Sequence, residues 1–254
     1  MAHPAGEDLG DSHVVPTVWP MPPTMAQCES IIRARARFHA AWWNDARLGV
    51  SIGIRPGHAA FDQYLKRFTA AFDRFEGQVA DRLTRDRREL FARFVDNLPR
   101  LAARRRAGGT ITIIHGDGHV WNCFLPSDRK SDDVRLFDWD AWRLGLGSDD
   151  LAYMMAVHWY PDMRHEREVS LLDHYHATLT ARGVKGYDRR SLNEDYRLSV
   201  LWQLMTPVWQ AWYNIPPVIW WNNLERVLLA VDDLDCRNLL SRAAPLDCDR
   251  SALD

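Results

Sequence analysis

The chain has 254 residues, of which 46% are hydrophobic and 26% charged, a composition that excludes disordered and fibrous proteins. Its net charge of -2 gives no general electrostatic reason to bind nucleic acid or an anionic membrane, so we expect a small-molecule partner, no nucleic acid and no membrane. The four cysteines lie far apart and no secretory signal is evident, which favours the reducing cytoplasm.

Residues 1–23 are rich in proline and polar residues, which predicts an extended strap rather than a domain. Thr24 and Gln27 form a capping-box pattern that predicts the start of a helix, and apolar residues then recur at helical spacing until Gly49. The same spacing predicts a second helix over 61–75 and a third over 79–101.

Short strands are predicted after this helical region. Gly108 and Gly109 end it, and residues 110–114 form a β-branched, apolar run that is typical of a buried strand. Residues 123–125 and 134–137 predict two further short strands on either side of a polar turn.

The pattern is helical again from residue 149 to residue 240, with breaks near Pro161, at 183–186 and at 216–217. The uncharged stretch 200–221 is interrupted by polar residues and prolines, so it predicts a buried helix followed by a turn rather than a membrane span. We therefore expect an α+β fold that is mostly helical, with a small β-insert.

The β-insert carries the residues suited to chemistry. Asp117 and Asn122 lie five residues apart on a loop that leaves the first strand, and a later strand ends in Asp138. An aspartate on such a loop can orient a substrate hydroxyl and accept its proton, while an asparagine oxygen and a second carboxylate suit magnesium held against nucleotide phosphates. Taken alone, Asp117 can also be an ordinary aspartate that caps a turn.

Three segments in this order resemble the C-terminal lobe of the aminoglycoside phosphotransferase and choline kinase-like family, including its ecdysteroid kinase-like members. They are His115-Gly116-Asp117 through Asn122, Leu136-Phe137-Asp138-Trp139, and Asp149-Asp150-Leu151-Ala152. Residues 38–43 are similar to the first helix of that lobe. The resemblance implies a protein-kinase-like large lobe over residues 24–254, with the catalytic loop on the β-insert.

The resemblance also implies an activity and its residues. ATP and Mg²⁺ would be the cofactors, and the γ-phosphoryl group of ATP would pass to a small-molecule hydroxyl. Asp117 would be the catalytic base, Asn122 and Asp138 the magnesium ligands, and His115 and Asp150 would support the catalytic loop. For Asp150, a plain helix N-cap is an alternative that is compatible with this role. The role of Asp140 stays open.

The sequence departs from the family where a small N-terminal lobe is expected. The only lysine before the catalytic loop, Lys66, lies in a predicted helix, and no glycine cluster precedes a strand there. Residues 6–13, with Glu7, Asp8 and Leu9, resemble the nucleotide-contacting hinge between the lobes. We therefore expect the small lobe to be missing and the isolated chain to be weak or inactive. A separate small-lobe polypeptide or a homodimer, truncation of the sequence, and a lobe-only pseudoenzyme are the open explanations.

The C-terminal helices are rich in tryptophan. If they line the acceptor pocket, as the resemblance implies, Trp202, Trp209 and Trp212 form an aromatic wall, whereas the alternative is core packing. No acidic residue occurs from 200 to 223, which favours a neutral, partly apolar alcohol over a polycationic aminoglycoside.

Two other functional classes remain open. The chain can be a non-catalytic, pseudokinase-like binding or interaction module. Alternatively, His115, Asp117 and His119 form an H-x-D-x-H pattern that is compatible with a metal-dependent hydrolase. Cys123 beside the loop lacks an evident histidine-plus-acid arrangement, so we expect a buried strand residue there.

Overall fold

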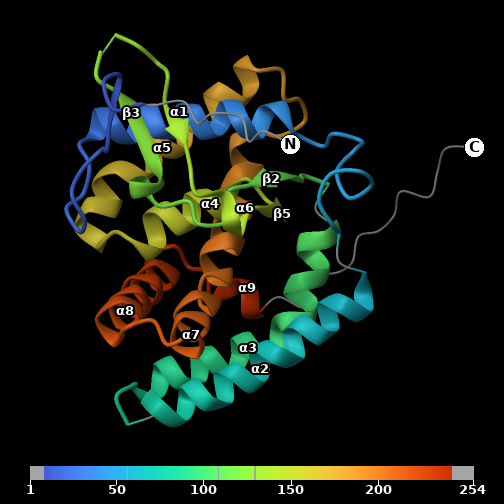
Figure 1. Ribbon diagram of the computed structural model, residues 1–254. Helices are drawn as coiled ribbons and strands as arrows, with labels where there is room; N and C mark the ends of the chain where they lie inside the picture. The colour runs from blue at the N-terminus through green and yellow to red at the C-terminus, as the bar shows by residue number, and fades with distance from the viewer. Residues whose placement is uncertain (1–8, 56, 80, 108, 129, 242–254) are drawn as a thin grey trace, which may run out of the picture.

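A computed structural model describes residues 9–55, 57–79, 81–107, 109–128 and 130–241. Within these ranges the fold is mostly helical with two small β-sheets, as the sequence predicts (Figure 1). The helices are α1 (Met25–Ala41), α2 (His58–Val79), α3 (Arg85–Ala107), α4 (Ser148–Ala152), α5 (Pro161–Ala181), α6 (Arg189–Trp202), α7 (Met205–Trp212), α8 (Pro217–Asp233) and α9 (Asn238–Ser241). The strands are β1 (His13–Val14), β2 (Thr112–Ile114), β3 (Cys123–Pro126), β4 (Arg135–Leu136) and β5 (Arg143–Gly145). Single turns of 3-10 helix form η1 (Val120–Asn122) and η2 (Trp139–Ala141), and a π-helical turn forms η3 (Tyr153–Val157).

Helix α1 begins as predicted but ends early. The Thr24 side chain and the Gln27 side chain each bond the other residue's backbone N–H, so the capping box is confirmed. The prediction that the helix continues to Gly49 is wrong. After Ala41 the chain turns, and Asn44 adopts the left-handed region at φ 52°, where its side chain bonds the backbone just before β2.

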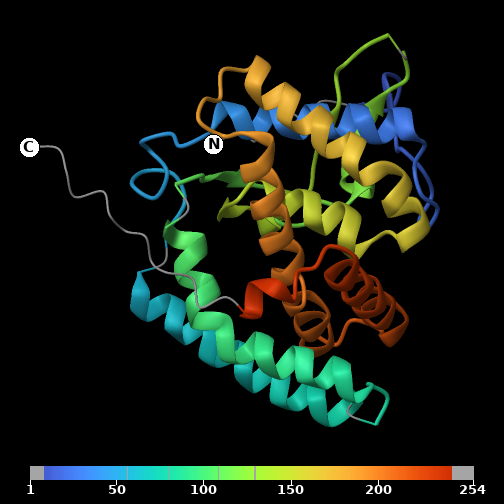
Figure 2. The same ribbon diagram turned by 180° about the vertical axis from the view of Figure 1, so that it is seen from behind.

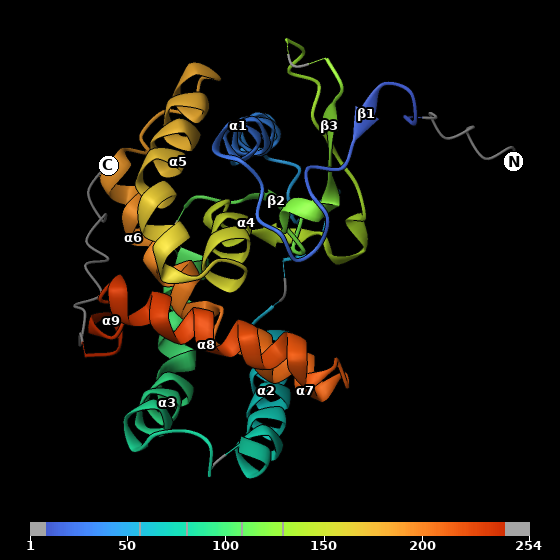
Figure 3. The ribbon, with the colours of Figure 1, turned by 90° about the vertical axis from the view of Figure 1, so that its left-hand side faces the viewer.

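Helices α2 and α3 form an antiparallel hairpin at one end of the molecule, crossed by α7 and α8 (Figure 3). Aromatic rings fill this junction. Phe68 is fully buried, with ring centroids 6.3 Å from Phe94 of α3 and 5.7 Å from Trp209 of α7. Val79 is the last residue of α2, so the third predicted helix begins later than expected, at Arg85.

The two sheets are antiparallel and hold the candidate loop between them. In one, β3 lies between β1 and β4; in the other, β2 pairs with β5 so that Ile114 lies opposite Arg143. The residues 9–23 of the predicted strap thus contribute a strand, because His13 and Val14 pair with β3. Neither β1 nor β5 was predicted, since two or three residues carry too little alternation.

The remaining helices enclose the sheets. Helices α1 and α5 pack side by side, and α6 runs from this layer toward α7 and α8 (Figure 2). Helix α4 continues directly into the π-helical turn η3, a rare geometry that is frequent at functional sites. No helix in the described part of the chain is long and apolar enough to span a bilayer.

The aromatic junction should dominate the stability of the α2–α3 hairpin. We expect Phe68→Ala to lower the free energy of unfolding by about 3–5 kcal/mol, because it leaves a cavity among packed rings. Urea denaturation followed by circular dichroism measures this change. The control is Val169→Ala on α5, where the side chain is 63% exposed and the change should stay within about 0.5 kcal/mol. Equal effects of the two substitutions would contradict this packing.

Candidate active site

The loop that follows β2 is held in place by the buried carboxylate of Asp150. Its Oδ2 accepts the His115 backbone N–H at 2.8 Å, and its Oδ1 accepts the Gly116 backbone N–H at 2.9 Å. The His39 Nε2 lies 3.2 Å from Oδ2. Asp150 is the third residue of α4, whose N-cap is Gly147, so the N-cap alternative is wrong. Both carboxylate oxygens of Asp150 therefore accept backbone N–H groups of the loop just before Asp117.

The pKa of Asp150 reflects these contacts. Burial alone would raise the pKa of this carboxyl, but the hydrogen bond and charge of His39, the charge of Arg35 and the Gly116 N–H outweigh burial. The pKa therefore lies well below its usual range, and the group is an anion at neutral pH. A fixed negative charge thus orients the two backbone amides that precede Asp117.

Two buried polar residues of α1 also contact the loop or Asp150. Arg35 and His39 lie on the face of α1 that also carries Cys28, Ile31 and Ile32, and all are buried. Arg35 donates to the His119 carbonyl at 3.3 Å, and His39 Nδ1 lies 2.8 Å from the Tyr175 hydroxyl. We did not predict Arg35, although an arginine at helical spacing within an apolar face was a visible signal.

His115 connects the loop to the segment that carries Asp138. Its Nε2 lies 2.7 Å from the Phe137 carbonyl, and its Nδ1 accepts the Asp117 backbone N–H at 3.3 Å. These partners require a neutral ring with the proton on Nε2. Both ring nitrogens are therefore engaged, so His115 is not placed to bind a metal with Asp117 and His119. Among the residues that the structure describes, no three His, Cys, Asp or Glu side chains are grouped to hold a metal ion.

Asp117 and Asn122 lie in direct contact. The Asn122 Nδ2 donates to the Asp117 Oδ2 and to the Asp117 carbonyl, both at 3.0 Å. The Asp117 side chain is 34% exposed, so the carboxylate remains accessible. Because the Asn122 nitrogen is committed to Asp117, its amide oxygen is the atom left for a cation.

Asp138 is brought next to Asn122 by the pairing of β3 with β4. The Phe137 backbone N–H donates to the Asn122 carbonyl at 3.2 Å, so Asp138 follows directly beside it. Asp138 adopts the left-handed region at φ 62°, an unusual backbone for aspartate that occurs at functional sites. Within the described ranges its carboxylate has no hydrogen-bond or ion-pair partner. A carboxylate and an amide oxygen are ligand types that magnesium prefers, so Asp138 and Asn122 are the residues here with suitable chemistry for that ion.

A cluster of rings that the sequence did not predict lies beside Asp117. His158 contacts His119, Trp121 and Tyr153, with ring centroids 5.6, 5.7 and 5.0 Å away. Burial lowers the pKa of His158 to about 4, and burial also lowers the pKa of His119, so both rings are neutral at pH 7. Burial raises the pKa of Tyr153, and the charge of Asp117 raises it further.

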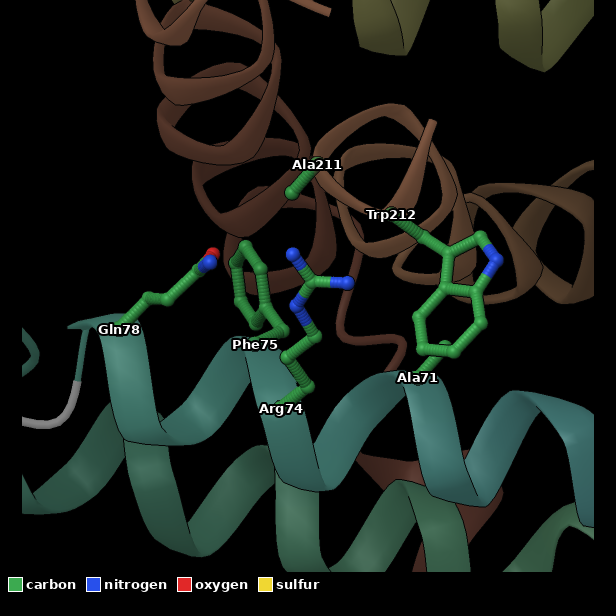
Figure 4. Close-up of a pocket in the computed structure, with 6 residues that line it drawn as sticks. All are labelled: Ala71, Arg74, Phe75, Gln78, Ala211 and Trp212. Atoms are coloured by element: carbon green, nitrogen blue, oxygen red, sulfur yellow. The ribbon is translucent and has the colours of Figure 1, made fainter. Parts of the chain in front are cut away.

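The three predicted pocket tryptophans do not share one site. Trp209 of α7 donates its Nε1–H to the hydroxyl of Tyr64 on α2 at 3.1 Å. Trp202 of α6 stacks on Phe61, which also lies on α2, with ring centroids 6.4 Å apart. These two rings are half-buried against the core. Trp212 lies elsewhere: its ring centroid is 5.6 Å from the Arg74 guanidinium carbon, and both side chains line a small surface pocket (Figure 4).

The remaining predicted residues have simpler places. The Leu9 carbonyl accepts the Ser12 and His13 backbone N–H groups in the turn before β1, while Glu7 and Asp8 lie outside the described residues. Cys123 is buried, and burial raises the pKa of its thiol, which is typical of an inert core residue. Asp140 is exposed and lies in η2.

A mostly helical lobe in which a strand leads into a loop with paired aspartate and asparagine is typical of kinase-like phosphotransferases. The sequence model of the ecdysteroid kinase-like family matches residues 50–185, more than half of the chain. The chain belongs to this family, as the motifs indicated. A comparison with curated proteins found no match.

The carboxylate of Asp150 should make stability depend on pH. We expect Asp150→Asn to lower the free energy of unfolding at pH 7 by about 3 kcal/mol. The side-chain NH2 that replaces one carboxylate oxygen cannot accept a hydrogen bond, so a buried backbone N–H would lose its acceptor. The pKa is lower in the folded than in the unfolded chain, so the stabilisation is present above the unfolded pKa and is lost as pH falls through the folded pKa.

Urea denaturation at several pH values tests this dependence. The difference between wild type and Asp150→Asn should be constant from about pH 7 to 5 and should narrow below about pH 4. The exposed Asp96 of α3 provides the control, since Asp96→Asn should change stability little at any pH. A difference that persists undiminished far into the acid range would contradict the assignment.

Proposed function

We propose that this chain is the catalytic lobe of a phosphotransferase that moves the γ-phosphoryl group of ATP to a hydroxyl of a small, mostly apolar molecule. The observation that carries the proposal is that Asn122 bonds the Asp117 carboxylate while the backbone just before Asp138 pairs with Asn122. Membership of the ecdysteroid kinase-like family supports the reaction class, and kinases of this type generally use ATP with Mg²⁺.

The chemistry follows from what each residue offers. The acceptor oxygen bonds to the γ-phosphorus, the bond from that phosphorus to the β–γ bridging oxygen breaks, and ADP leaves with the electron pair. The hydroxyl proton passes to the Asp117 carboxylate, which Asn122 orients. Magnesium held by the Asn122 oxygen and the Asp138 carboxylate would neutralise phosphate charge. The site therefore acts by positioning and by charge neutralisation.

Separate roles for the two aspartates give a direct test. We expect Asp138→Ala to abolish saturable binding of Mg-ATP in isothermal titration calorimetry, because it removes a metal ligand. Asp117→Asn should leave that binding within about threefold. The phosphoryl transfer, which we expect to be weak for the isolated chain, should fall at least about a hundredfold, the usual scale of general acid–base catalysis.

The control for these titrations is Asp96→Ala, which makes the same charge change on the exposed face of α3. Mg-ATP binding that survives Asp138→Ala would contradict the metal assignment. Binding of an acceptor without any binding of Mg-ATP would instead favour a non-catalytic module.

The proposed acceptor is a hydroxylated, mostly apolar molecule such as a steroid alcohol. The family is named for kinases of ecdysteroids, which are hydroxylated steroids. Half-buried Trp202, Trp209 and Tyr64 supply apolar and hydrogen-bonding surface, and no carboxylate occurs between residues 200 and 223 to attract a polycation.

Thermal shift measurements distinguish the acceptor classes. A polyhydroxylated steroid at about ten times its Kd should raise Tm by about 3 °C or more, because it binds the folded chain only. A polycationic aminoglycoside at the same concentration should give no shift. The control ligand is the same steroid with its hydroxyl groups methylated, which should lose most of the effect. A larger shift with the aminoglycoside would contradict the proposed acceptor.

A further inference from the structure

Three arginine side chains contact the candidate loop or the helix α4 that follows it, and they differ in what they can reach. Arg35 is fully buried and donates to the His119 carbonyl of the loop, and Arg105 is paired with the buried carboxylate of Asp149. Arg143 is exposed on β5, and its only hydrogen bond in the described part of the chain is a long one of 3.3 Å to the Ala141 carbonyl. No carboxylate there neutralises it. Arg143 is therefore the member of this group whose charge is free to meet a ligand.

The guanidinium of Arg143 rests on the residue directly before Asp117. The pairing of Ile114 with Arg143 places Arg143 opposite the point where the loop leaves β2. A Cβ on Gly116 would lie only 2.4 Å from the Arg143 Nη1 and 2.2 Å from the Ala141 carbonyl oxygen, and Gly116 has φ 83°. Both the left-handed backbone and the close approach thus require glycine at this position.

The charge of Arg143 also acts on two half-buried tyrosines. Burial raises the pKa of Tyr153 and of Tyr64, and in both cases the Arg143 charge acts in the opposite direction. Tyr153 adjoins Asp117, and Tyr64 accepts the Trp209 Nε1–H. The charge of Arg143 therefore acts on both of these tyrosines.

We propose that Arg143 binds the phosphoryl group during its transfer, with its guanidinium on the non-bridging oxygens beside Asp117. This inference rests on the proposed function. The bonds that break and form are those given above, and Arg143 neither gains nor loses a proton. Negative charge on the phosphoryl oxygens is what such a site must stabilise, and a planar guanidinium can donate two hydrogen bonds to one phosphate.

The decisive comparison is between nucleotides with and without the third phosphate. Isothermal titration calorimetry would measure binding of Mg-ADP and of the magnesium complex of a non-hydrolysable imido analogue of ATP. The variants are Arg143→Gln, Arg143→Lys and the control Arg190→Gln, which removes one positive charge from the exposed surface of α6. Asp138→Ala reports on the metal site in the same titrations.

We expect Arg143→Gln to weaken binding of the ATP analogue at least about tenfold, the scale of a hydrogen bond between charged groups, and to change Mg-ADP binding less than about threefold. Arg143→Lys should lie between wild type and Arg143→Gln, because it keeps the charge but loses the planar pair of donors. Arg190→Gln should match wild type for both nucleotides.

Two results would overturn the proposal while leaving the proposed function intact. Either Arg143→Gln binds the ATP analogue as wild type does, or it weakens both nucleotides equally, while Asp138→Ala still abolishes binding. A wild-type chain that binds neither nucleotide would overturn the Arg143 assignment together with the proposed function.

Discussion

The buried charge of Asp150 is the interaction on which the candidate site depends. One carboxylate accepts two consecutive backbone amides, from His115 and Gly116, and a third group from His39. A buried anion is tolerated only when its oxygens are satisfied in this way. The loop is thus held through its backbone rather than through its side chains. The orientation of Asp117, the next residue, follows from that constraint.

A second layer of order comes from His115, which ties this loop to the segment of Asp138. Because its two nitrogens contact a carbonyl on one segment and an amide on the other, a single neutral tautomer sets the spacing of both. The β3–β4 pair does the same from the other side by placing Asn122 next to Phe137. Two short strands and one imidazole therefore hold the segments of Asp117, Asn122 and Asp138 together.

The sequence predicts those parts of this arrangement that depend on residues close together in the chain. The capping box of Thr24 and Gln27, the buried strand before the loop and the order of the family motifs all depend on residues close together in the chain. The adjacency of Asn122 and Asp138 was expected from the resemblance.

The parts that could not be predicted depend on distant contacts. Helix α1 ends early because Asn44 bonds the backbone before β2. Trp212 does not lie beside Trp209, because its ring contacts Arg74 of α2 instead. The strands β1 and β5 are too short to show a pattern. Arg143 gave no signal in the sequence, since its position against Gly116 comes from the pairing of β2 with β5.

The buried side chains that hold the candidate loop also determine when it can form. Arg35 bonds a carbonyl 84 residues away, His39 lies against a carboxylate 111 residues away, and the same histidine reaches a tyrosine 136 residues further along the chain. Contacts of such sequence separation form only after much of the chain has been ordered. The loop is therefore not an independent folding unit, and its ordered form requires that α1, α4 and α5 are packed around it.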